Sequence, residues 1–220
     1  MKQKPRTFAV IGLGTFGSTV ATELQRFGNY VIGIDSSEAN TARLSDQLSQ
    51  ALILDARDEV ALREAGLGDC DVAIIAIGED LEANVLAAIN AKMIGVKVVW
   101  AKAISKTHHR ILSKIGVDRV IHPEQEVGQH IAQVLHNPYV RDYVGLGNGF
   151  HIVNFVVSPA LQGKELAALD LSKKFGLRCL GVMRGTEYIC GPDGDCVLEA
   201  DDYLILLGRR TELREFGASL

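Results

Sequence analysis

The sequence predicts an α/β protein in which a doubly wound parallel sheet is followed by a small α+β lobe. Up to about residue 135, short and almost continuous apolar runs alternate with helical segments, which is typical of parallel strands covered by helices on both faces. The first of these runs ends in a glycine-rich turn. After Asn137 and Pro138 the pattern changes to short strands separated by turn residues, which predicts a second lobe.

The glycine-rich turn follows the first predicted strand and has the pattern Gly-x-Gly-x-x-Gly. Gly12 permits a tight turn, Gly14 presents no Cβ where a phosphate would lie, and Gly17 lets the next helix pack closely on the sheet. The N-terminus of that helix offers N–H groups and a positive dipole end to phosphates. The residues predicted to bind phosphate are Gly12, Gly14, Thr15, Phe16 and Gly17.

The second predicted strand, residues 30–34, is followed by Asp35. A carboxylate at this position accepts hydrogen bonds from a ribose diol. The series of strand, turn, helix, strand and acid is the Rossmann-like dinucleotide-binding arrangement. It favours nucleotide binding over the alternative of a Rossmann-like domain that has lost its ligand. Asp35 and the adjoining Ser36 therefore belong to the predicted site.

The remaining elements follow in chain order and divide the chain into three parts. The N-terminal domain, 7–135, has further predicted strands at 51–54, 72–77, 96–101 and 119–121, and helices at 38–48, 58–65, 81–94 and 107–115. Residues 136–150 form a linker with a flexible glycine-rich junction at 145–149. The C-terminal domain, 151–220, has strands at 151–157, 177–183, 187–190 and 203–207, and helices near 164–171 and 211–216. Its thin core predicts pairing with another copy.

Composition excludes several classes of protein. The net charge is −4 and no basic cluster is present, so a nucleic-acid partner is not expected. No apolar run approaches the roughly 18 residues that cross a bilayer, and no signal-peptide pattern is seen, which predicts a cytoplasmic protein that can still dock on a membrane protein. Cysteines are then expected to be reduced. Cys190 and Cys196 are interpreted as small packing residues, with a disulfide or metal role as the less favoured alternatives.

The small C-terminal lobe argues against an enzyme. A dehydrogenase needs a proton-transfer group poised beside the nicotinamide, and the single histidine of this lobe, His151, opens a predicted strand. Its carboxylates cluster at turns, where solvated acids usually lie. No serine, histidine and aspartate set, and no cysteine and histidine set, has a mechanistic logic. The sequence therefore predicts a binding protein rather than a catalyst.

At this level of detail the chain resembles the RCK family, the regulators of K⁺ conductance, and within it the regulatory subunits of bacterial Ktr potassium-uptake systems. The resemblance covers essentially the whole chain. The segment 115–124 and the small C-terminal lobe are more specific than the glycine turn, which many folds share. The matching segments are 8–17, 72–78, 100–103, 115–124 and 201–208.

The resemblance implies a cytosolic regulator that works as a homo-oligomer. Members of the family assemble as an octameric ring of dimers against the inner face of a membrane ion-translocating subunit, KtrB. ATP and ADP compete for the cleft at the carboxyl ends of the strands, and ATP favours the active ring state. A ligand drives such a change only through its difference in affinity for the two states.

The resemblance also implies further binding residues. Asp55 and Ala56 would lie beside adenine, and the end of the fourth strand would lie beside the ligand, at Ala76, Ile77 and Gly78. Lys102 would reach phosphate as a point charge, or else be a solvated lysine at the end of a strand. Glu124 would bind a divalent cation such as Mg²⁺ shared between subunits, or else be a helix-start acid that complements the dipole.

The chain departs from its relatives at two places. Thr15 stands where relatives often carry an arginine that reads the γ-phosphate, so discrimination between ATP and ADP would depend on other groups. Ala168 and Ser172 stand where an aspartate and an arginine bind cyclic di-AMP in some relatives, so no such site is expected. Two alternatives stay open: an NAD(H)-reading regulator of the Trk type, and a small NAD-dependent oxidoreductase.

Overall fold

The computed structural model describes residues 4–191 and 194–220. The chain forms two compact units, of which the first ends at Glu124 and the second begins at Gln125. This division comes earlier than the expected end of the N-terminal domain at residue 135. The reason is that the helix α6, Pro123–His136, groups almost entirely with the C-terminal unit.

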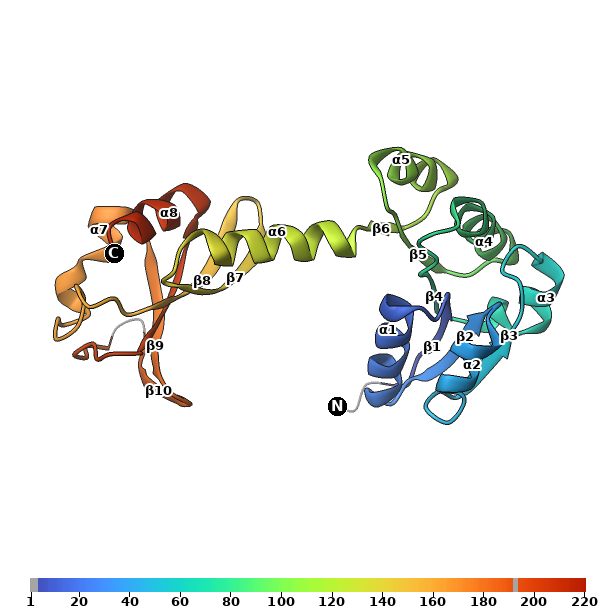
Figure 1. The fold of residues 1–220 in the computed structure, drawn as a ribbon, viewed down its shortest axis with the longest axis horizontal. Coiled ribbons are helices and arrows are strands. Elements are labelled where there is room, and N and C mark those ends of the chain that lie inside the picture. Colours follow the sequence, from blue (N-terminus) through green and yellow to red (C-terminus); the bar gives the residue numbers. More distant parts are fainter. Residues whose placement is uncertain (1–3, 192–193) are drawn as a thin grey trace. The chain divides into compact units, whose positions relative to one another are not determined.

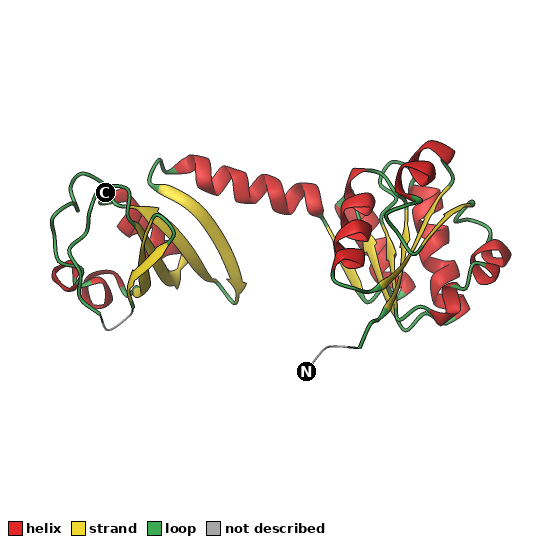
Figure 2. Ribbon diagram, turned by 90° about the horizontal axis from the view of Figure 1, so that it is seen from below, coloured by secondary structure: helices red, strands yellow, loops and turns green. Residues whose placement is uncertain are grey.

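The N-terminal unit is a six-stranded parallel sheet. Helices cover both of its faces, as Figures 1 and 2 show. The strand order is β3-β2-β1-β4-β5-β6. The first three strands are therefore added outward in one direction from β1, and the last three outward in the opposite direction from β4. The strands are β1 Thr7–Ile11, β2 Tyr30–Asp35, β3 Gln50–Ile53, β4 Val72–Ile75, β5 Val98–Lys102 and β6 Arg119–Ile121. The helices are α1 Thr15–Arg26, α2 Glu38–Leu44, α3 Glu59–Glu64, the 3₁₀ turn η1 Leu67–Asp69, α4 Leu81–Ile94 and α5 Lys106–Ile115. The predicted doubly wound sheet is confirmed.

Alternation along the strands sorts their side chains into two cores. On β1, Ala9 and Ile11 belong to the core beneath α3, α4 and α5, whereas Phe8 and Val10 belong to the core beneath α1 and α2. Successive side chains of a strand point to opposite faces, so a strand that is covered on both sides is apolar throughout. This is why the strands appear in the sequence as unbroken apolar runs.

The C-terminal unit contains an antiparallel sheet of five strands in the order β10-β9-β11-β8-β7. Its strands are β7 Val140–Gly147, β8 Phe150–Val156, β9 Arg178–Arg184, β10 Glu187–Cys190 and β11 Tyr203–Arg209. Its other helices are η2 Ala167–Leu169, α7 Leu171–Phe175 and α8 Arg210–Ala218. In the core of this unit the rings of Phe155 and Phe216 pack edge to face, with ring centroids 5.2 Å apart.

The segment expected to be a flexible junction is part of this sheet. β7 pairs with β8, and Gly147, Asn148 and Gly149 turn the chain between them with positive φ angles. A tight hairpin needs such φ values, which glycine and asparagine adopt at low cost. Glycine-rich sequence therefore marks a hairpin here rather than a linker. The expected helix at 164–171 is also different, since η2 and α7 replace it.

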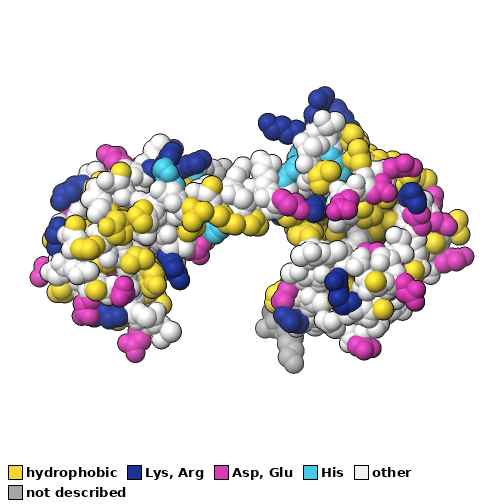
Figure 3. Space-filling view, viewed as in Figure 1, with side chains coloured by type: hydrophobic (Ala, Val, Ile, Leu, Met, Phe, Trp, Pro, Cys, Tyr) yellow, Lys and Arg dark blue, Asp and Glu magenta, His cyan; other side chains and the backbone are white. Residues whose placement is uncertain are grey.

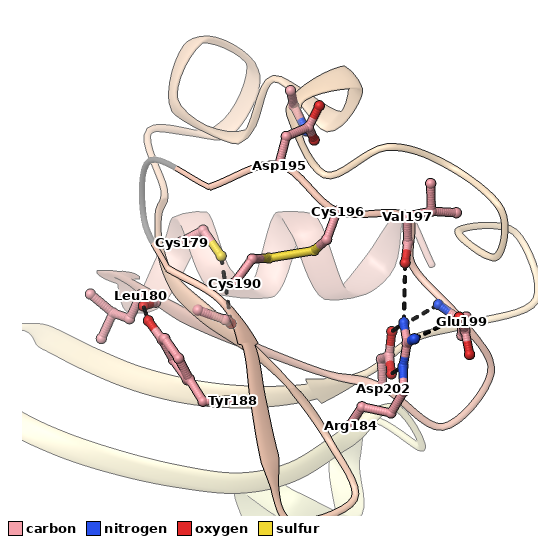
Figure 4. The surroundings of a disulfide bond; sticks show 12 residues. Cys179, Leu180, Arg184, Tyr188, Cys190, Asp195, Cys196, Val197, Glu199 and Asp202 are labelled. Carbon is pink, nitrogen blue, oxygen red and sulfur yellow. Dashed lines mark hydrogen bonds and ion pairs between the residues drawn. A yellow bond between two sulfur atoms is a disulfide. The ribbon is translucent and has the colours of Figure 1, made fainter.

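The cysteines of the C-terminal unit differ from the interpretation drawn from sequence. Cys190 and Cys196 are joined as a disulfide, whereas two reduced packing residues were favoured (Figure 4). Cys190 lies within the apolar core of the unit and Cys196 packs against it. Cys70 and Cys179 are free thiols, and burial raises the pKa of Cys70 to about 11. Over the part of the chain that the structure describes, no helix combines the length and apolar character needed to traverse a lipid bilayer.

Candidate nucleotide-binding cleft

The glycine turn begins with a residue that only glycine can occupy without strain. Gly12 has a φ of +93°, and its N–H donates a hydrogen bond to the carbonyl of Ile34, 2.7 Å away. A Cβ at Gly12 would lie 2.9 Å from the backbone nitrogen of Ile77. The turn therefore brings the end of β1 against the end of β4, as the motif requires.

The other two glycines of the motif face different surroundings. A Cβ at Gly17 would lie 1.8 Å from the carbonyl oxygen of Gly12, so the helix could not approach the turn with any larger residue there. A Cβ at Gly14 would meet no atom within 4 Å. The structure thus assigns Gly17 to packing and leaves open space beside Gly14, where the sequence predicts a phosphate.

The N-terminus of α1 offers unpaired N–H groups beside this open space. Gly14 caps the helix without a side-chain hydrogen bond, and the first turn carries no acidic residue. Side chains cap four other helices of this unit: Ser37 on α2, Asp58 on α3, Asp80 on α4 and Ser105 on α5. An uncapped N-terminus of a 12-residue helix is a favourable place for an anion.

Asp35, the predicted ribose acceptor, also holds the turn together. Its Oδ2 accepts a hydrogen bond from the Leu13 N–H at 2.6 Å, and its Oδ1 accepts one from the Ser37 N–H at 2.8 Å. The side chain of Asn40 donates a longer bond, 3.3 Å, to Oδ2. Each carboxylate oxygen accepts about two hydrogen bonds, so Oδ1 keeps capacity for a ligand hydroxyl.

A cleft of about 310 Å³ lies at the carboxyl ends of these strands. It brings together most of the residues predicted from sequence: Gly12, Gly14, Asp35, Ser36, Asp55, Ala56, Ala76, Ile77 and Gly78. Side chains that the sequence analysis missed also line it, namely Asn40, Arg57, Glu79, Asp80 and Ala83. The predicted Thr15, Phe16, Gly17, Lys102 and Glu124 are not among its lining residues.

The far end of the cleft carries an ion pair that sequence analysis did not anticipate. The guanidinium of Arg57 binds both carboxylate oxygens of Asp55, with its Nη2 2.7 Å from Oδ2, and this pairing lowers the pKa of Asp55. The buried amide of Asn90 donates to the carbonyls of Ala56 and Arg57. A helix residue far away in the sequence therefore shapes the loop predicted to contact adenine.

Lys102 lies at the end of β5 beside Gly78 and is buried rather than solvated. Its side chain is 11% exposed, and its Nζ is 2.5 Å from Oε1 of Glu124. The ammonium also lies 5.9 Å from the centre of the Phe16 ring, in the first turn of α1. The carboxylate of Glu124 is 67% exposed, and the hydrogen bond from Lys102 holds its pKa below the usual value.

A buried amide joins the ends of β4 and β5. The side-chain N–H groups of Asn84 donate to the carbonyls of Ile77 and Lys102, at 2.5 and 3.1 Å. Its Oδ1 lies 3.1 Å from Nε2 of His108, whose Nδ1 accepts from the Ile104 N–H. Burial lowers the pKa of His108, which is consistent with a neutral ring protonated at Nε2. An asparagine within an alanine-rich helix was the available sequence signal for this network.

The described parts of the chain contain no group of three or more histidine, cysteine, aspartate or glutamate side chains that would hold a metal ion. Glu124, the predicted cation ligand, is a single carboxylate whose Oε1 faces the Lys102 ammonium. A cation at Glu124 would therefore need further oxygen ligands from phosphate, water or another copy of the chain. Mg²⁺ commonly takes such a mixed set, so the residue fits a cation only where such ligands complete the coordination.

Comparison with known proteins finds related domains in both units. Residues 8–123 match the TrkA-N domain and residues 150–220 match the TrkA-C domain. The Ktr system potassium uptake protein A of Vibrio alginolyticus is 39% identical over 213 residues, which is 97% of each chain. The Ktr system potassium uptake protein C of Bacillus subtilis is 35% identical, over 96% of each chain.

Solved structures agree at the level of fold. The GsuK channel superposes with a TM-score of 0.68 at 14% identity, covering 97% of this chain and 39% of that one. The GsuK RCK domain gives a TM-score of 0.66, with 98% of this chain and 47% of that chain covered. The two domain matches and the identity to the Ktr proteins place the chain in the family of Ktr-type potassium uptake proteins that combine a TrkA-N with a TrkA-C domain.

Proposed function

We propose that this protein is a cytosolic, nucleotide-sensing regulatory subunit that gates a KtrB-like membrane potassium-uptake protein. ATP would favour the active state of an octameric ring and ADP the inactive state. The observation that carries the proposal is the uncapped N-terminus of α1, whose N-cap residue Gly14 has open space beside it and lines the same cleft as Asp35. Relatives of nearly equal length are named as potassium uptake proteins of Ktr systems.

The proposed role is regulatory because three carboxylates of the cleft are already engaged in holding its shape. Asp35 binds the glycine turn, Asp55 pairs with Arg57, and Asp80 caps α4. None of the three is aligned with a second group in the way that acid–base catalysis requires. We therefore infer binding and release of a nucleotide, without turnover, as the work of this cleft.

NAD(H) is the second candidate ligand, because it presents the same ribose diol to Asp35 as ATP does. One structural neighbour of the same fold is a GsuK channel bound to NAD, at 14% identity and a TM-score of 0.65. A thermal-shift series with ATP, ADP, NAD⁺ and NADH, with and without Mg²⁺, separates the candidates. A ligand at 100 times its Kd adds about 2.7 kcal/mol of stability.

Substitution Asp35→Ala is expected to weaken ATP binding by roughly 1.5–3 kcal/mol, because it removes charged acceptors of the ribose hydroxyls. The variant also loses the bonds to Leu13 and Ser37, so Asn40→Ala serves as the control that removes only the third partner of the carboxylate. Titration calorimetry measures both. An ATP affinity unchanged in Asp35→Ala would show that the ribose lies elsewhere.

The chain is expected to be a ring of dimers in solution. On α6, Val127, Ile131 and Leu135 are 56, 49 and 78% exposed, and a groove of about 820 Å³ lies between α6, β8 and α8 within the C-terminal unit. Exposed apolar side chains are also visible on this unit in Figure 3. Such surfaces are usual at interfaces. A monomeric mass by light scattering at micromolar concentration, with or without nucleotide, would contradict this expectation.

Mg²⁺ is expected to stabilise the ATP-bound protein more than the ADP-bound protein, through Glu124. Phosphate oxygens and a carboxylate are suitable Mg²⁺ ligands, and a cation there would offset the phosphate charge where Thr15 offers none. The measurement is the Mg²⁺-induced shift in melting temperature at saturating ATP or ADP and matched ionic strength, in wild type and Glu124→Gln. Equal Mg²⁺ effects in the two proteins would leave Glu124 as an ordinary helix-start acid.

A further inference from the structure

The ion pair between Lys102 and Glu124 lies beside Gly78, a residue that lines the cleft at the end of β4. We propose that Glu124 is a built-in competitor of the terminal phosphate for the Lys102 ammonium, and that this competition sets the selectivity between nucleoside triphosphates and diphosphates when no divalent cation is bound. The inference rests on the proposed nucleotide-binding function. It concerns a contact between two side chains of the N-terminal unit.

The order of strands gives the direction of the phosphate chain. Asp35 ends β2, the glycine turn follows β1, Gly78 follows β4, and Lys102 ends β5. These strands are consecutive neighbours in the sheet, in the order β2-β1-β4-β5. A nucleotide whose ribose is held by Asp35 and whose first phosphates lie at the glycine turn therefore extends each further phosphate toward β4 and β5.

The Lys102 ammonium is positioned at the end of this path. A Cβ on Gly78 would lie 3.1 Å from Nζ, which places the charge directly against the turn after β4. On its other side Nζ is 5.9 Å from the ring of Phe16, whose N–H belongs to the uncapped turn of α1. The ammonium and the helix N-terminus thus border the same space from two sides, and both favour an anion there.

Glu124 already pairs with this ammonium. The contact between Nζ and Oε1 is 2.5 Å, and Lys102 is one of the few charged side chains that are buried in the described structure. A buried ammonium is stable only with a partner, so removing the carboxylate raises the affinity of Lys102 for another anion. An incoming terminal phosphate must either displace Glu124 from the ammonium or share the ammonium with it, so part of the ion-pair energy is lost in both cases.

The competition applies to one class of ligand only. A triphosphate reaches Lys102 and meets the carboxylate, whereas a diphosphate ends nearer the glycine turn and does not. Glu124 therefore lowers affinity for the longer phosphate chain selectively. A divalent cation would bind both the carboxylate and the phosphate, so the competition is to be measured in the presence of a chelator.

The experiment is titration calorimetry with ATP and ADP in EDTA, on wild type, Glu124→Gln, Lys102→Gln and the double variant. Glu124→Gln is expected to bind ATP about fivefold more tightly than wild type, the scale of a partly exposed ion pair, and to bind ADP unchanged. In the Lys102→Gln background the same substitution is expected to have no selective effect. The matched control is Glu126→Gln. It removes the same charge at an exposed position two residues after Glu124, and it should leave the ratio of the ATP and ADP affinities unchanged.

Three results would overturn the inference. Equal gains for ATP and ADP would mean a general effect of charge, and a gain that persists without Lys102 would mean that the two groups do not compete. A loss of ATP affinity in Glu124→Gln would mean that the carboxylate itself assists binding. If wild type bound neither nucleotide, the proposed function itself would be wrong, and the inference with it. In the three results above wild type does bind nucleotide, so failure of the inference and failure of the proposed function are distinguishable.

Discussion

Gly17→Ala is expected to damage the fold, whereas Gly14→Ala is expected to damage only nucleotide binding. The added Cβ at Gly17 would lie 1.8 Å from the carbonyl oxygen of Gly12, so either α1 must move off the sheet or the turn must open. Overpacking against backbone costs typically 1–3 kcal/mol and can cost more, and we expect about 3 kcal/mol here. Nucleotide binding should be lost with it, because the turn and the helix N-terminus move together.

Gly14→Ala separates these two effects. Its φ of −62° suits any residue, and no atom lies within 4 Å of the added Cβ, so the loss of stability should be no more than about 1 kcal/mol, the scale of a helix-cap change. The methyl group would nevertheless occupy the space predicted for a phosphate. We expect ATP affinity to fall at least about tenfold, or 1.4 kcal/mol. Chemical denaturation and calorimetry measure the two quantities, and full ATP affinity in Gly14→Ala would place the phosphates elsewhere.

Asp202→Ala is expected to destabilise the C-terminal unit by about 3 kcal/mol. The carboxylate of Asp202 is fully buried and accepts hydrogen bonds from Nε and Nη2 of Arg184, at 2.8 and 2.9 Å, and from the Glu199 N–H at 2.8 Å. Figure 4 shows this arrangement. Breaking a buried pair by removing one partner costs about 3–5 kcal/mol, and the lower value applies because the Arg184 side chain is 35% exposed.

The same ion pair predicts how stability depends on pH. The hydrogen bonds from Arg184 hold the pKa of Asp202 below its usual value in the folded protein. In the unfolded chain the pKa of Asp202 is about 4, so as pH falls the unfolded chain binds a proton more readily than the folded protein does. The stabilisation from the ion pair is therefore present above about pH 4 and is lost as pH falls through the lower pKa of the folded protein. The free energy of unfolding of Asp202→Ala should therefore fall less steeply with decreasing pH than that of wild type.

The control for this prediction is Glu199→Gln, at a carboxylate that also contacts Arg184 but is 61% exposed. Its effect should be below about 1 kcal/mol, as for exposed ion pairs. Circular dichroism during urea denaturation follows the whole chain, and the fluorescence of Trp100, the single tryptophan, follows the N-terminal unit. An equal loss in both variants, or a loss confined to the Trp100 signal, would refute the assignment.

Elements with clear cap or turn residues at both ends were predicted closely from sequence. The helix at Leu81–Ile94 and the strands at Arg119–Ile121 and Glu187–Cys190 have the predicted bounds. In each case local signals mark both ends, such as Asp80 as an N-cap and Gly95 in the left-handed conformation after α4. Where composition is ambiguous the prediction differs, as at Val140–Gly147, because glycine-rich sequence suits both a linker and a hairpin.

By itself the sequence determined the class of fold, the glycine turn, the acid after the second strand and the family, because these depend on residues that are close together in the chain. Only the tertiary structure decided which side chains oppose one another at the cleft. Lys102 faces Glu124 because β6 pairs with β5 and Glu124 follows the end of β6 at the same edge of the sheet. Asn84 joins the ends of β4 and β5 because α4 packs across both strands. The energy of such contacts depends on burial and on exact distance, and neither is encoded by spacing along the chain.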